Sequence, residues 1–211
     1  MKVSVSILSS SINAADIVKK LDNTDADYIH VDIMDGKFVE NKTWTFGEVK
    51  KITSYSRLPL DVHLMVENPK KYIEDYALLN TDTITFHYEA VKDVNEMIEY
   101  VKNYGLKVGI AINPETDASV LFPYLNNIDE IIVMSVHPGK SGQTFIYDSL
   151  DKIKLLREKI DEIGSKARIN VDGGINDETG ALCKEAGVHM VVSASYIHKD
   201  IRNNIKILKN L

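Results

Sequence analysis

Short runs of apolar and β-branched residues recur along the chain, and longer amphipathic segments separate them. This alternation is typical of repeated strand–helix units. The runs that we predict as strands are residues 3–8, 28–33, 60–65, 83–87, 107–112, 130–134, 168–171 and 190–192.

Between these runs, apolar residues return at spacings of three and four, which predicts helices. The clearest helical segments are residues 69–79, 94–104 and 146–163. Asn68 before Pro69 predicts an N-cap with proline in the first helical turn. Gly105 stands where a C-terminal cap is expected.

Eight alternating units close as a barrel or open as a doubly wound sheet, and periodicity alone does not separate these folds. The polar residues favour the barrel, because histidines, aspartates and methionines gather at the C-terminal ends of the predicted strands, where barrel enzymes carry their chemistry. No linker-like or low-complexity tract interrupts the chain. We therefore predict one α/β domain over residues 1–211, a single (β/α)8 TIM barrel with a closed parallel sheet of eight strands.

Composition narrows the classes of function. The 25 basic residues are scattered and the net charge is −6, which argues against binding to nucleic acid. Cys183 is the only cysteine, so no internal disulfide is possible, and the chain fits the reducing cytoplasm. The apolar run within residues 1–8 is too short for a signal peptide or a membrane span, and we expect neither export nor a membrane role.

Two neighbouring predicted strands place imidazoles beside carboxylates. Residues two apart on a strand face the same side, so His30, Asp32 and Met34 point together. The next strand aligns Asp61, His63 and Met65 in the same way, and the seventh ends on Asp172 followed by Gly173 and Gly174.

Imidazole and carboxylate together suit Zn²⁺, Fe²⁺, Mn²⁺ or Co²⁺. A histidine on a buried strand is also often a hydrogen-bonded core residue, so the spacing of His30 and Asp32 leaves both interpretations open. The methionines beside them are equally consistent with core packing or with the wall of a pocket.

Six segments extend this pattern over nearly the whole chain. They are residues 6–9 (SILS), 30–39 (HVDIMDGKFV), 61–65 (DVHLM), 113–116 (NPET), 133–136 (VMSV) and 171–175 (VDGGI). In their sequence and order they resemble the ribulose-phosphate 3-epimerases.

The resemblance implies one divalent metal ion per subunit (Zn, Fe, Mn or Co) and names its ligands as His30, Asp32, His63 and Asp172. It also makes Asp32 and Asp172 the base and the acid that move a proton at C3 between D-ribulose 5-phosphate and D-xylulose 5-phosphate through an enediolate. Members of the family assemble as dimers or hexamers, so we expect a homo-oligomer.

The resemblance further implies the residues that bind the sugar phosphate. Those near the reacting carbons are Ser6, Met34, His63, Met65 and Met134, and those near the phosphate are Gly139, Lys140, Ser141, Gly142, Gly173, Gly174, Ala194 and Ser195. Glycines let backbone N–H groups approach an anion closely, and a short helix beginning near Ala194 is expected to aim its positive end at the phosphate.

The chain departs from the family pattern at several positions. The usual Pro-Gly-Phe-Gly-Gly-Gln loop is PGKSGQ at residues 138–143, and His137 stands where an acidic residue is common. Glu40 replaces a frequent proline, Ala194 a frequent glycine and Ser11 a frequent aspartate. None of these changes removes a predicted ligand, so they put the identity of the sugar phosphate in doubt rather than the type of reaction.

Two alternatives stay open. An epimerase for a related ketose phosphate, such as allulose 6-phosphate, would use the same ligands, and a non-catalytic barrel would bind metal or sugar phosphate as a sensor. Among the remaining polar residues, His87 and Glu89 are expected to hydrogen-bond at the barrel rim, and Asp61 either orients a ligand or pairs with a nearby cation.

Overall fold

A computed structural model describes residues 1–8 and 12–211. Ser9 and Ser11, named above from the sequence, lie outside these ranges. Eight parallel strands close into a barrel in chain order, so the predicted fold is confirmed. The strands are β1 (Lys2–Ser6), β2 (Tyr28–Met34), β3 (Leu60–Met65), β4 (Thr81–His87), β5 (Lys107–Ile112), β6 (Glu130–Met134), β7 (Arg168–Asp172) and β8 (Met190–Ser193).

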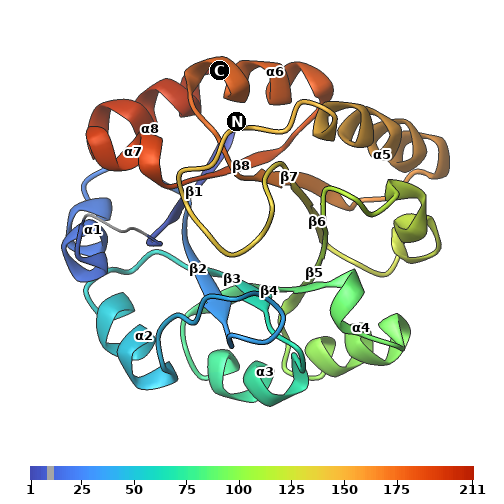
Figure 1. Ribbon diagram of the computed structural model, residues 1–211, viewed down its shortest axis with the longest axis horizontal. Helices are drawn as coiled ribbons and strands as arrows, with labels where there is room; N and C mark the ends of the chain where they lie inside the picture. The colour runs from blue at the N-terminus through green and yellow to red at the C-terminus, as the bar shows by residue number, and fades with distance from the viewer. Residues whose placement is uncertain (9–11) are drawn as a thin grey trace.

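Helices form a ring around the barrel (Figure 1). The α-helices are α1 (Ala14–Leu21), α2 (Phe46–Thr53), α3 (Lys70–Ala77), α4 (Val94–Lys102), α5 (Ser149–Ile163), α6 (Asp177–Ala186), α7 (Ser195–Lys199) and α8 (Ile201–Asn210). Two 3₁₀ segments, η1 (Tyr88–Ala90) and η2 (Ala118–Tyr124), complete the described elements. Within residues 1–8 and 12–211, none of these helices combines the length and the apolar character that crossing a bilayer requires.

Two local predictions need correction. The first strand ends at Ser6 rather than at residue 8, because the Ser6 hydroxyl accepts a bond from the Leu8 backbone N–H at 3.2 Å and turns the chain. Asn68 is not the cap of α3. The N-cap position is Pro69, which is already helical, and the Lys71 N–H bonds to the backbone carbonyl of Asn68 instead of its side chain.

The alternation of side chains on β2 shows how the sequence builds both faces of the sheet. Ile29, Val31 and Ile33 are buried in the apolar layer between sheet and helices. His30 and Asp32 point into the barrel and are also buried. The inner face of the barrel therefore carries polar groups that an apolar layer shields from solvent.

Gly109 on β5 marks a place where the barrel interior tolerates no side chain. A Cβ there would lie 2.0 Å from the Thr85 Oγ1 and 2.9 Å from its Cβ, and both residues are buried. Gly109→Ala is therefore expected to destabilise the fold by about 1–3 kcal/mol, the usual range for overpacking a core. Gly47→Ala, on the exposed surface of α2 with no atom within 4 Å of the new Cβ, is the matched control.

Urea denaturation followed by circular dichroism measures both variants. Gly47→Ala is expected to leave stability unchanged or raise it by up to about 1 kcal/mol, since alanine is the better helix former. Equal stability of Gly109→Ala and the unsubstituted protein would contradict the tight packing at β5.

The loop between β6 and α5 reaches over the middle of the barrel (Figure 1). The side-chain amide of Asn41, in the loop after β2, donates to the Gly139 carbonyl at 2.7 Å. Val39 from the same loop packs against Gly139, where a Cβ would lie 3.2 Å from the valine. Two loops that are far apart in sequence thus meet at the mouth of the barrel.

Candidate active site

Polar side chains stand opposite one another on β2 and β3. The register of these strands pairs His30 with Asp61, Asp32 with His63, and Met34 with Met65. Paired residues on parallel strands lie at the same height in the barrel. The inner face therefore has His30 and Asp61 at the lowest height, Asp32 and His63 above them, and Met34 and Met65 at the top.

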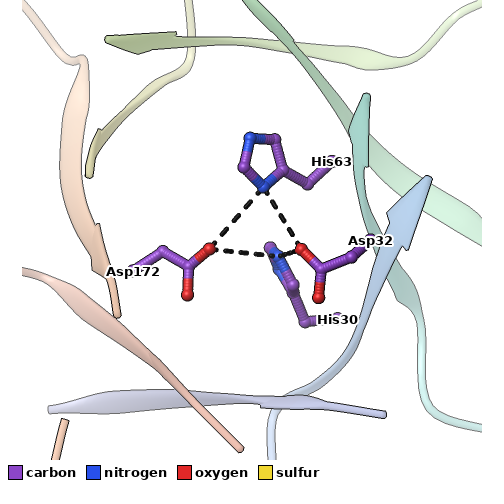
Figure 2. A group of neighbouring side chains, drawn as sticks. All are labelled: His30, Asp32, His63 and Asp172. Atoms are coloured by element: carbon purple, nitrogen blue, oxygen red, sulfur yellow. Dashed lines mark hydrogen bonds and ion pairs between the residues drawn. The ribbon is translucent and has the colours of Figure 1, made fainter. Parts of the chain in front are cut away.

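His30, Asp32, His63 and Asp172 meet around one centre (Figure 2). Asp172 ends β7 on the far side of the barrel and points toward the other three residues. The His30 Nε2 lies 3.2 Å from Asp32 Oδ1 and 3.8 Å from Asp172 Oδ2. The His63 Nδ1 lies 3.4 Å and 3.6 Å from the same two oxygens.

These four separations suit a divalent cation. Tetrahedral ligands placed 2.0–2.2 Å from zinc are about 3.3–3.6 Å apart. The His63 Nδ1 is buried and has no hydrogen-bond partner, although two carboxylate oxygens face it. A buried polar atom without a partner is costly, and a cation at the centre would satisfy it. The residues therefore fit a metal ion of the kind that the sequence predicts.

The pKa shifts of His30 and Asp32 also favour a cation at this centre. Burial lowers the pKa of His30, but the carboxylates of Asp32 and Asp61 outweigh it and raise that pKa well above its ordinary value. Burial raises the pKa of the Asp32 carboxyl, but His30 and His63 outweigh it and hold the pKa below its ordinary value. The Asp32 carboxylate is thus ionised and suited to a cation, and binding of a cation would displace protons from the imidazoles.

Asp61 and Ser6 each hydrogen-bond to one of the four residues at the centre. Asp61 Oδ2 lies 2.7 Å from the His30 Nδ1 and accepts a bond from the Ser4 hydroxyl at 2.9 Å. This contact turns the other ring nitrogen of His30 toward Asp32 and Asp172. Of the two interpretations offered for Asp61, the geometry matches the one in which it orients a ligand. The Ser6 hydroxyl donates to Asp32 Oδ2 at 2.8 Å, and both residues line one pocket.

One pocket above the centre brings together most of the residues predicted to bind substrate. The predicted residues along its wall are Ser6, Asp32, Met34, Met65, Met134, Gly139, Lys140, Ser141, Gly142, Asp172, Gly173, Gly174, Ala194 and Ser195. His30 and His63 are not in this wall, since both are fully buried beneath it. The three methionines are buried and line the pocket as well, so packing and pocket lining coincide in them.

Gly174 occupies a position that only glycine suits. Its φ is +63°, and a Cβ there would lie 2.7 Å from the Phe145 backbone. The chain after β7 therefore comes very close to the loop after β6, and both segments line the pocket. The predicted short helix is present as α7, which follows Ala194 at the same wall.

Of the two residues that the sequence placed at the rim, His87 contacts a predicted ligand, whereas Glu89 hydrogen-bonds to His87 and to the segment after β5. The His87 Nε2 lies 2.9 Å from the His63 Nε2, and Glu89 Oε2 lies 3.3 Å from the His87 Nδ1. His87 follows the same alternation on β4 as Thr83 and Thr85, which was the available signal. The partner of His87 depends on the packing of β3 against β4, so the spacing of residues along one strand does not reveal it.

The fold and this arrangement of side chains define a class: a (β/α)8-barrel enzyme with paired carboxylates and imidazoles at the C-terminal ends of its strands. Known proteins narrow the class further. The model of the "Ribulose-phosphate 3 epimerase family" matches residues 2–198, so the chain belongs to that family and is an isomerase.

Similar proteins carry the same family name. The chain is 39% identical over 200 residues to a ribulose-phosphate 3-epimerase from Bacillus subtilis, covering 94% of this chain and 92% of the relative. It is 38% identical over 206 residues to one from Chlamydia pneumoniae, covering 93% and 90%. Among solved structures, N-(5'-phosphoribosyl)anthranilate isomerase from Pyrococcus furiosus matches with a TM-score of 0.67 at 18% identity, over the full length of both chains, which shows the shared fold.

Proposed function

We propose that this chain is a metal-dependent epimerase that interconverts D-ribulose 5-phosphate and D-xylulose 5-phosphate. The observation that carries the proposal is the meeting of Asp32 and Asp172, from opposite sides of the barrel, at a centre that also holds His30 and His63. Family membership and the names of the relatives support the choice of substrate.

Two opposed carboxylates suit inversion at a carbon beside a carbonyl. Asp32 accepts the C3 proton on one face of the substrate, and Asp172 donates a proton on the other face of the planar enediolate. In the reverse direction the two residues exchange roles. The hydroxyl of Ser6 keeps the Asp32 carboxylate oriented toward the pocket throughout.

His30, Asp32, His63 and Asp172 would hold the cation. When bound, it supplies Lewis-acid stabilisation of the negative charge that develops on the substrate oxygens. Met34, Met65 and Met134 narrow the pocket above the carboxylates and limit the access of water to the reacting carbon.

The phosphate is proposed to bind on the far wall of the pocket. Gly173 and Gly174 follow β7 there, and α7 begins beside them at Ser195. Backbone N–H groups at glycines and at a helix start favour an anion without a cluster of basic side chains. Lys140, on the loop between β6 and α5, also lines the pocket and adds a positive charge to it.

Incubation with D-ribulose 5-phosphate in heavy water tests the function. The cation-loaded protein is expected to form xylulose 5-phosphate that carries deuterium at C3, because the proton donated on the second face comes from a carboxyl group in exchange with solvent. Nuclear magnetic resonance follows the product and its deuterium together, across a panel of Zn²⁺, Fe²⁺, Mn²⁺ and Co²⁺.

Each alternative gives a different result in this experiment. Faster turnover of allulose 6-phosphate than of ribulose 5-phosphate would indicate the six-carbon substrate. Binding of the sugar phosphate without exchange of the C3 hydrogen would indicate a sensor and overturn the enzymatic proposal. Identity of the ion, assembly as a dimer or hexamer, a single domain over residues 1–211 and a cytoplasmic location stay predictions.

A further inference from the structure

A line of hydrogen-bonding groups runs from the His63 ring away from the proposed metal centre. The His63 Nε2 lies 2.9 Å from the His87 Nε2, and the His87 Nδ1 lies 3.3 Å from Glu89 Oε2. The other oxygen of that carboxylate, Oε1, accepts from the Asn113 backbone N–H at 2.8 Å and from the Thr116 hydroxyl. Both histidines are fully buried, so water cannot substitute for these partners.

The two imidazoles are nearly parallel and approach each other through their Nε2 atoms. Their ring planes differ by only 20° and their centroids are 4.9 Å apart, which suits one N–H···N bond between the Nε2 atoms. Such a bond needs a proton on one Nε2 and a lone pair on the other. The direction of the bond therefore decides which nitrogen of His63 carries a proton.

Glu89 fixes that direction. An ionised carboxylate only accepts hydrogen bonds, so the proton of His87 lies on Nδ1 and its Nε2 offers a lone pair. The Nε2 of His63 must then carry the proton that fills the bond. This leaves the lone pair of His63 on Nδ1, the atom that faces Asp32 and Asp172.

We propose that Glu89 and His87 are positioning residues that lock His63 in the tautomer able to bind a cation through Nδ1. The proposal rests on the metal centre proposed above and assigns to it two residues beyond the four ligands. Neither residue is among the described residues that line the pocket, so we expect their effect on the reaction to pass through His63.

Replacing one oxygen of Glu89 by an amide group is the sharpest test. In Glu89→Gln the single remaining oxygen is required by the fixed N–H of Asn113, so the amide nitrogen faces the His87 Nδ1. Because that nitrogen donates, His87 must accept at Nδ1 and carry its proton on Nε2. His63 then accepts at Nε2 and carries its proton on Nδ1, where the cation should bind.

Glu115→Gln makes the same chemical change in a matched pair that touches no ligand. Glu115 Oε1 lies 3.1 Å from the His137 Nδ1, and both side chains are mostly exposed. Zinc affinity, measured by competition with a coloured chelator, is expected to fall about 10–100-fold in Glu89→Gln, the usual cost of losing a group that orients a metal ligand. It is expected to stay within about twofold in Glu115→Gln, since an exposed pair of this kind contributes little.

The tautomers are observed directly in the unsubstituted protein, which removes any dependence on how Glu89→Gln folds. Long-range proton–nitrogen correlation spectra of the zinc-loaded protein are expected to show His87 protonated on Nδ1 alone and His63 protonated on Nε2. A proton on the His87 Nε2 would overturn the proposal, and so would equal zinc affinity in Glu89→Gln and Glu115→Gln.

These experiments distinguish failure of the proposed metal-dependent function from failure of the tautomer proposal. If the unsubstituted protein binds none of the four cations, the metal centre and the tautomer lock both fall. If it binds zinc and epimerises ribulose 5-phosphate while Glu89→Gln binds zinc equally well, only the lock falls. Weaker zinc binding confined to Glu89→Gln, with the expected tautomers, supports it.

Discussion

Asparagine in place of Asp172 is expected to lower kcat for the epimerisation of ribulose 5-phosphate by a factor of about 10²–10⁴, the usual contribution of a positioned acid or base. The amide keeps an oxygen directed at the cation but neither donates the catalytic proton nor accepts one. Asp32 remains on the opposite face of the pocket. The variant should therefore place deuterium from heavy water on recovered ribulose 5-phosphate while forming almost no xylulose 5-phosphate.

Asp32→Asn should show the mirror image of this behaviour when the reaction starts from xylulose 5-phosphate. Asp177→Asn is the control, because Asp177 is an exposed residue in the first turn of α6 that lies outside the pocket wall. Zinc content, measured on each purified variant, shows whether the ligand role persists. Turnover by Asp172→Asn within tenfold of the unsubstituted enzyme contradicts the assignment of two bases.

Removal of the divalent cation is expected to have an effect of similar size. Lewis-acid stabilisation of the developing charge is worth several kcal/mol, which corresponds to a fall of about a thousandfold in kcat. The measurement is turnover of ribulose 5-phosphate after dialysis against a strong chelator, with circular dichroism to show that the barrel persists.

Readdition of single cations completes the experiment. Protein dialysed without chelator is the control for losses in handling, and restored turnover with Zn²⁺, Fe²⁺, Mn²⁺ or Co²⁺ identifies the ions that the four ligands accept. Full activity in protein shown by elemental analysis to hold less than one ion per hundred chains would refute the metal-dependent mechanism.

The strands and their inner faces were predictable because each depends on residues close together in sequence. Val31 alternates with His30 and Asp32, and a period of two dictates which of them enters the barrel. The ends of elements were less predictable. The end of β1 and the start of α3 depend on single hydrogen bonds at Leu8 and Lys71, which compete with the preferences of the residues themselves.

The residues that hydrogen-bond to the proposed ligands could not be predicted from periodicity. Asp61 and His87 were visible in the sequence as polar residues on strands, but their partners lie on neighbouring strands. Which atoms meet depends on the register between strands and on side-chain rotamers, and one chain segment encodes neither alone. A role for Asp61 in orienting a ligand was one of two interpretations, but neither its partner His30 nor the contact of His87 with His63 was predicted.

The loop between β6 and α5 shows a third limit of prediction from sequence: its departures from the family pattern do not reveal whether its position changes. Lys140 and Ser141 depart from the family pattern, yet the loop still meets Asn41 and lines the pocket. The backbone contact at Gly139 does not depend on the residue types that follow it, so the change alters the chemistry of the wall and preserves its position. We therefore expect this change to affect substrate preference.

The four proposed ligands reach the centre from strands that are synthesised at very different times. His30, Asp32 and His63 lie on β2 and β3, whereas Asp172 lies on β7 and arrives only when most of the chain has left the ribosome. A growing chain would thus present three of the proposed ligands before the fourth, and an ion bound at that stage would be held weakly and exchange. We therefore expect the folded barrel, rather than the growing chain, to select one cation from those that the surrounding solution supplies.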